Sequence, residues 1–176
     1  MARLRKILVQ QAFLEESPLQ VYTIAARCGF GEEMKIASGY TLGVYIIDSP
    51  PTDIEGLSAI DYRCLLQFHQ RRARSALQLL GDVIPQGSAC SGCRSYVMGW
   101  HEEYKRKAKG ELALRPKSDT ICSPSFLAPI IDEFETEKCS AESCRRAGGR
   151  YQHHLSYLET LKKRIDLLPG AVGCCE

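Results

Sequence analysis

The chain has 176 residues, of which 44% are hydrophobic and 25% charged, and its 23 basic and 21 acidic residues give a formal net charge of +2. This length and composition are typical of a folded globular chain with a real core, and they exclude a disordered tail. Because the charges nearly balance, the overall electrostatic field of the protein does not attract it to nucleic acid or to an anionic membrane. A polyanion partner would need a local basic patch.

The first 47 residues predict three short helices that pack as one unit. Apolar residues recur at helical spacing over residues 4–14. Ser17 and Pro18 are typical of an N-cap and a first helical residue, and Gly29 is typical of a helix that ends in a left-handed residue. Gly31 opens the third helix, and two glutamates follow it at the favourable N-terminal end.

Residues 48–56 predict a linker, because Pro50 and Pro51 can continue neither a helix nor a strand. The short β-branched run just before it, residues 44–47, fits a strand or a helix end. We therefore expect a short-helix unit over residues 1–47 and a long-helix unit over residues 57–176.

The sequence of the long-helix unit predicts helices along its whole length. Ser58 is placed to cap the first, whose apolar face runs from Tyr62 to Leu80. A second begins near Ser95, a third follows Ser123, and the last covers residues 141–168, with an apolar face that includes Leu155. Because no alternating strand pattern occurs, the predicted fold class is all-α, a bundle of about six helices with a cysteine-rich loop stapled by zinc.

Two pairs of cysteines carry the strongest chemical signal. Each pair lies between two predicted helices and leads into the second of them, and the four residues are Cys90, Cys93, Cys139 and Cys144. Thiolates are the preferred ligands of structural zinc, so we predict one Zn²⁺ ion bound by all four. The second pair is more widely spaced than usual, which leaves open a replacement of Cys139 or Cys144 by His101, Cys122 or His69. The zinc would be structural, since a site of four cysteines is coordinatively closed.

The state of the remaining cysteines depends on the cellular compartment of the protein. The N-terminal apolar run is too short for a secretory signal, and the longest charge-free window, residues 36–47, is too short to span a membrane. The sequence therefore predicts a cytoplasmic or nuclear protein with reduced thiols and no membrane partner. Cys28, Cys64 and Cys122 are predicted to be small buried hydrophobic side chains, and His69 a hydrogen-bonded core histidine.

Two other functions stay open beside a non-enzymatic one. A zinc-dependent nucleic-acid-binding protein would need the basic clusters at 105–109 and 145–146 to converge near the metal, although such clusters, like that at 71–74, also fit a solvated helix face. A thiol redox enzyme would need Cys90 or Cys93 as an exposed thiolate, but such motifs follow a strand and none is predicted. No phosphate-loop, hydrolase or metalloprotease motif occurs, so we predict no enzyme.

A family resemblance covers most of the chain. Residues 16–30, ESPLQVYTIAARCGF, residues 37–42, ASGYTL, and residues 60–69 with the following C-x-x-C and Trp100 resemble the region just after the BTB core of fungal BTB/POZ-domain proteins. The strands and early helices of that core have no counterpart in this sequence, and residues 4–14 match only its last helix. The resemblance implies a C-terminal helical region that serves as a protein-interaction or adaptor module with an unidentified protein partner.

Overall fold

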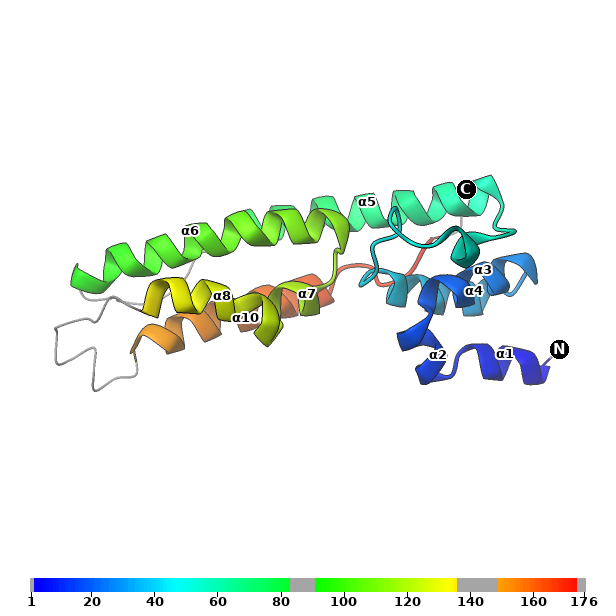
Figure 1. The fold of residues 1–176 in the computed structure, drawn as a ribbon, viewed down its shortest axis with the longest axis horizontal. Coiled ribbons are helices and arrows are strands. Elements are labelled where there is room, and N and C mark those ends of the chain that lie inside the picture. The colour runs from blue at the N-terminus through cyan, green and yellow to red at the C-terminus, as the bar shows by residue number, and fades with distance from the viewer. Residues whose placement is uncertain (1, 83–90, 136–148, 174–176) are drawn as a thin grey trace. The chain divides into compact units, whose positions relative to one another are not determined.

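The computed structural model describes residues 2–82, 91–135 and 149–173 (Figure 1). Helices and turns account for these residues, and no strand occurs among them, which confirms the predicted all-α class. The described residues contain more helices than the predicted six, because the first expected helix is divided and two short helices, at 51–54 and 118–122, were not predicted. No helix in these ranges is long and apolar enough to cross a membrane.

The chain forms two compact units, described here separately. Unit 1 consists of residues 1–74, 114–116 and 169–176, and unit 2 consists of residues 75–113 and 117–168. The division therefore falls within a long continuous helix and not at the expected linker, because residues 48–56 belong to unit 1. Within that segment, residues 51–54 form a 3₁₀ helix that packs against the helix α3 (Pro18–Arg27).

Unit 1 begins with short helices and ends in the first part of the longest one. They are α1 (Ala2–Leu8), α2 (Gln11–Glu16), α3 (Pro18–Arg27), α4 (Gly31–Thr41), η1 (Pro51–Ile54) and α5 (Ala59–Asp82). The single helix expected over residues 4–14 is two helices, with the break at Val9 and Gln10. The run at residues 44–47 is neither strand nor helix, and its residues lie in turns and bends.

Local signals placed several boundaries of unit 1 correctly. Helix α3 begins at Pro18, and Gly29 follows it with a φ of 67°, the left-handed conformation that glycine adopts at low cost. Ser58 caps α5, since its Oγ accepts the N–H of Asp61 at 3.0 Å and donates to the Asp61 carboxylate at 2.5 Å. Cys28, however, is exposed, so its prediction as a core thiol is wrong.

The core of unit 1 includes a segment from the far end of the chain. Val172 is 3% exposed and packs in one cluster with Tyr22 and Leu65. Its N–H donates to the Oγ of buried Ser38 at 2.9 Å. A Cβ on the neighbouring Gly39 would lie 2.5 Å from the carbonyl oxygen of Gly170, so only glycine fits where this segment crosses α4.

Unit 2 contains the end of α5 and the remaining described helices. These are α6 (Ser91–Leu114), α7 (Ser118–Cys122), α8 (Pro124–Glu135) and α10 (Gly149–Asp166). Helix α6 begins earlier than the predicted Ser95 and continues past Gly110, and α7 was not predicted. Leu155 was expected on the apolar face of the last helix, but it is 56% exposed. Residues 141–148 of that predicted helix lie outside the described residues.

Candidate functional site

The predicted zinc ligands fall almost entirely outside the described residues. Cys90, Cys139 and Cys144 lie outside them, and Cys93 lies in the first turn of α6, where its side chain is not described. The four-cysteine site therefore stays a prediction. The described parts of α6 and α10 show where the two cysteine-bearing segments enter unit 2.

Helices α6 and α10 run in the same direction. Near their beginnings, Trp100 of α6 stacks on His154 of α10 with ring centroids 4.0 Å apart. Four residues further along α6, Tyr104 contacts Tyr157, three residues further along α10, at 5.7 Å. The residue numbers of the contacting pairs increase together along the two helices, so the helices are parallel. Both begin at the same end of unit 2, as Figure 1 also shows. This parallel arrangement brings the segments that follow both cysteine pairs to one end.

The distances along the two helices are compatible with a shared site. Trp100 lies nine residues after the first residue of α6, about 14 Å along its axis, and His154 lies five residues after the first residue of α10, about 8 Å. The start of α6 therefore projects about 6 Å beyond that of α10. Gly149 comes five positions after Cys144, and five steps of extended chain reach about 17 Å. Cys144 is therefore within reach of the level of Cys93.

A buried aromatic cluster lies beneath this end of unit 2. Trp100 is 1% exposed and stacks on Tyr104 as well as on His154, while His101 meets the face of Tyr157 edge-on at 4.8 Å. Both histidines are buried, and burial raises the pKa of both tyrosines above its ordinary value. The prediction that Trp100 and Tyr104 are core residues is confirmed. Because Trp100 is the only tryptophan of the chain, its fluorescence reports on this end of unit 2.

Two of the alternative fourth ligands are poorly placed. His69 belongs to unit 1, where its Nε2 lies 3.0 Å from the Thr41 hydroxyl, which confirms a hydrogen-bonded core histidine. His101 follows Cys93 by eight residues on the continuous helix α6, about 12 Å along its axis. Two ligands of one tetrahedral zinc lie only about 4 Å apart. His101 and Cys93 therefore do not share one ion.

Cys122, the third alternative, is also unsuited to bind zinc. It is half-buried at the end of α7, and burial raises its pKa to about 11. Its thiol lies near Tyr104, thirteen residues into α6 and about 20 Å along the axis from the first residue of that helix. The thiol is thus distant along α6 from the end at which this helix begins.

Two basic residues of the cluster at 105–109 form ion pairs with nearby glutamates. Glu103 forms ion pairs with Arg106 at 2.6 Å and with Lys107 at 3.2 Å, and Lys107 also reaches Glu133 at 3.6 Å. The hydrogen bond from Arg106 is the main reason that the pKa of Glu103 falls to about 2. Arg145 and Arg146 lie outside the described residues. Two of the four basic residues at 105–109 are thus paired with carboxylates of α6 and α8.

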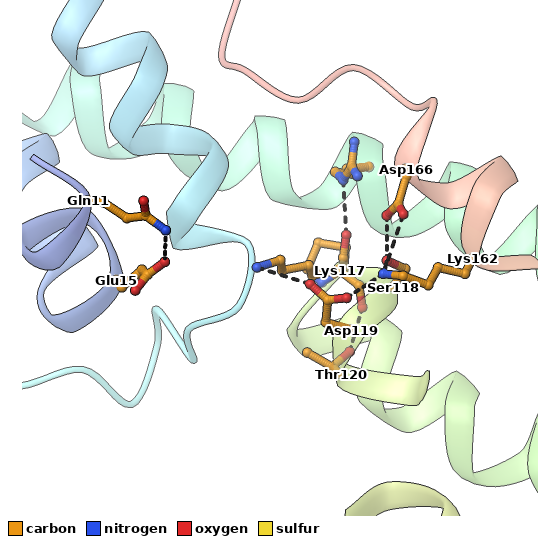
Figure 2. Close-up of polar contacts among 10 residues, drawn as sticks. Gln11, Glu15, Lys117, Ser118, Asp119, Thr120, Lys162 and Asp166 are labelled. Carbon is orange, nitrogen blue, oxygen red and sulfur yellow. Dashed lines mark hydrogen bonds and ion pairs between the residues drawn. The ribbon is translucent and has the colours of Figure 1, made fainter. Parts of the chain in front are cut away.

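A second polar site joins α7 to α10 in unit 2 (Figure 2). The fully buried Ser118 donates its hydroxyl proton to the Asp166 carboxylate and accepts a hydrogen bond from Lys162 Nζ at 3.1 Å. Lys162 also pairs with Asp119, and Asp119 lies 3.3 Å from Lys117 Nζ. Sequence reasoning missed this network, since its two halves are more than forty residues apart and neither half carries a motif.

The network resembles a nucleophile beside a base, but its electrostatics exclude that chemistry. A serine is activated when a neighbouring base takes its proton. The Asp119 hydrogen bond and the nearby Asp166 carboxylate raise the pKa of Lys162, so its ammonium keeps its protons. The Ser118 hydroxyl already donates to Asp166, and no part of its side chain is exposed to a substrate. The network therefore holds α7 on α10.

In comparisons with known proteins, no family model, curated protein or solved structure matches the chain. Within the ranges that the structure describes, no group of three or more histidine, cysteine, aspartate or glutamate side chains is placed to hold a metal ion. The predicted cysteine ligands lie outside that search. The end of unit 2 at which α6 and α10 begin is therefore the candidate site.

Proposed function

We propose that this protein is a non-enzymatic interaction module whose unit 2 is stabilised by one structural zinc ion on Cys90, Cys93, Cys139 and Cys144. The observation that carries the zinc site is the parallel arrangement of α6 and α10, which lets both cysteine-bearing segments enter the same end of unit 2. A closed site of four thiolates links two long connections that offer little core of their own. The resemblance to the region after a fungal BTB core supports the interaction role.

The first experiment measures zinc. We expect about one zinc per chain by elemental analysis after purification without chelator, and much less in Cys90→Ser and Cys139→Ser. Chelation should shift the emission of Trp100, because the metal would hold the segments that lead into its two helices. Cys28→Ser is the matched control, since Cys28 is an exposed free thiol in unit 1, and this variant should keep its zinc.

Two outcomes would overturn the zinc site. Zinc that persists in both ligand variants would mean that other residues bind it. A parent protein without zinc, whose Cys93 is alkylated rapidly at neutral pH, would favour the thiol redox alternative. That alternative requires Cys93 to be an exposed thiolate.

The surface that supports an interaction role lies on the first two helices. Leu4 and Ile7 of α1 are 42% and 39% exposed, and Phe13 of α2 is 46% exposed. Leu4 and Ile7 are three residues apart and thus share a face of α1. Large exposed apolar side chains on two successive helices are compatible with a surface that a partner covers. In the resemblance, this part of the chain corresponds to the last helix of a BTB core.

A photo-crosslinking residue tests this surface. Placed at Phe13 and illuminated in cells, it should crosslink to a distinct protein band, whereas the same residue at Leu155 should not. Leu155 is the matched control because it is similarly exposed but lies in unit 2. The additional change Ile7→Asp should abolish the band while the thermal unfolding curve keeps its midpoint. Equal crosslinking at both positions would contradict an interaction surface on α1 and α2.

A further inference from the structure

The solvent-facing side of α5 in unit 1 carries only basic and amide side chains after its first turn. The exposed residues beyond Ile60 are Arg63, Gln67, Gln70, Arg71 and Arg74. Successive residues of an α-helix are about 100° apart around its axis, so these five fall within an arc of about 100°. They therefore share one face of the helix, which we call the Arg–Gln face.

The opposite side of α5 fixes the direction of this face. Leu65 and Phe68 lie in the unit 1 core, and buried His69 is hydrogen-bonded within unit 1. Arg72 donates to two backbone carbonyls. Cys64 packs beside this core and is disulfide-bonded, so its prediction as a reduced thiol is wrong. Because its inner side is held in this way, α5 presents the Arg–Gln face to solvent along an outer edge of unit 1 (Figure 1).

The positive charge of the Arg–Gln face is not compensated by nearby carboxylates. Arg63, Arg71 and Arg74 form no ion pair with any residue in the ranges 2–82, 91–135 and 149–173. Asp61 is the only acidic residue of α5 within unit 1, and it lies about 120° around the helix from Gln67. The nearly neutral chain thus carries a local basic surface of the kind that a polyanion needs.

We propose that the Arg–Gln face binds double-stranded DNA in its major groove, a function beyond the interaction role proposed above. The major groove is about 12 Å wide and admits an α-helix. Arg63 and Arg71 are eight residues apart, about 12 Å along the axis of α5, so their guanidinium groups reach phosphates on both edges of the groove. Gln67 and Gln70 lie between them, where a glutamine amide pairs with N6 and N7 of adenine.

The composition of the Arg–Gln face favours DNA over other polyanions. Interfaces between proteins have an apolar core, whereas protein–DNA interfaces are more polar and much more positively charged. A helix that binds an anionic membrane buries an apolar face in it, and the residues from Arg63 to Arg74 on this face include none that is apolar. In double-stranded RNA the major groove is too narrow and deep for side chains to read. Duplex DNA is the polyanion that matches both the charge and the width of the face.

The salt dependence of DNA binding tests the proposal. The full-length protein, kept in zinc, is titrated into a fluorescent DNA duplex of about 20 base pairs, and anisotropy is followed between about 50 and 200 mM NaCl. Each phosphate contact contributes about 0.9 to the slope of log affinity against log salt. We therefore expect a slope lower by about 2.7 when Arg63, Arg71 and Arg74 are all replaced by glutamine. An unchanged slope, or no binding of the parent at 50 mM NaCl, would overturn the proposal.

Two further variants separate groove binding from loose attraction of opposite charges. Arg164→Gln is the matched control, because Arg164 is exposed on α10 in unit 2, and its affinity and slope should equal those of the parent. Replacing Gln67 and Gln70 by alanine should lower the preference for an A·T-rich over a G·C-rich duplex by about tenfold and leave the slope unchanged. Thermal unfolding midpoints equal to that of the parent show that the variants are folded. Equal affinity of the parent for duplex DNA, duplex RNA and polyglutamate would overturn the assignment to the major groove.

Discussion

Replacement of Arg72 by methionine should lower the free energy of unfolding by about 3–5 kcal/mol, an effect we expect in urea denaturation curves. Arg72 is only 7% exposed, and its guanidinium donates to two backbone carbonyls: Nε to Pro116 at 3.0 Å and Nη1 to Pro169 at 2.6 Å. Each such bond to a charged group contributes about 1.5–3 kcal/mol, and its loss leaves a carbonyl without that donor. Methionine fills most of the volume but donates no hydrogen bond.

The position of Arg72 explains why the effect should exceed that of an ordinary surface arginine. Pro116 and Pro169 belong to the two short stretches by which the later chain returns to unit 1. One side chain of α5 therefore fixes both returning segments. The solvated helix face predicted for residues 71–74 does not apply to Arg72, although Arg71 and Arg74 are exposed.

Arg71→Met is the matched control for Arg72→Met. It changes the same chemistry one residue away on an exposed position, and we expect a change of at most about 0.5 kcal/mol. Arg72→Lys keeps the charge but cannot hold two carbonyls in the planar geometry of a guanidinium, so its stability should fall between the two. Equal stability of Arg71→Met and Arg72→Met would show that the two hydrogen bonds from Arg72 to backbone carbonyls contribute nothing to stability.

The buried histidine of unit 1 should make stability depend steeply on pH. His69 is 7% exposed, and burial, with a further contribution from the nearby charge of Arg72, lowers its pKa from 6.5 to about 4. The Thr41 hydroxyl donates to the Ser38 carbonyl at 2.7 Å, so it offers a lone pair to His69 Nε2 at 3.0 Å. The histidine thus donates from Nε2 and is neutral in the folded state.

The sign of the pH effect follows from these two pKa values. Between pH 6.5 and about 4 the unfolded chain binds a proton at His69 and the folded protein does not, so acid favours unfolding. The stability contributed by neutral His69 is complete above pH 6.5 and is lost as the pH falls to about 4. Because one pKa unit corresponds to about 1.4 kcal/mol, the loss amounts to about 3 kcal/mol.

Urea denaturation of the parent and of His69→Gln across pH 4 to 7 measures this contribution. Glutamine can still donate to Thr41 but does not titrate, so the difference in stability between the two proteins should shrink by about 3 kcal/mol from pH 7 to pH 4. Acidic residues and the other histidines affect both proteins alike and cancel in the difference. Two curves that stay parallel over this range would show that His69 titrates normally in the folded protein.

The sequence alone determined the fold class and several helix boundaries of this protein. Helices are specified by residues a few positions apart, so the Ser58 cap, the positive φ of Gly29 and the buried spacing of Trp100, Tyr104 and Ala108 could all be predicted from short stretches. The same local reasoning selected His69 as a core residue. It also proposed the cysteine pairs as metal ligands, because their spacing is itself a local pattern.

Only the tertiary structure decided which distant residues meet. Arg72 binds carbonyls 44 and 97 residues further along the chain, and Val172 binds Ser38 across 134 residues. No local pattern encodes such pairs, because each depends on how several helices pack at once, and the same holds for Ser118 with Lys162. Even the division into two units lies inside α5, where the helical periodicity is unbroken. The parallel direction of α6 and α10, which supports the proposed zinc site, likewise results from packing and not from the spacing of any motif.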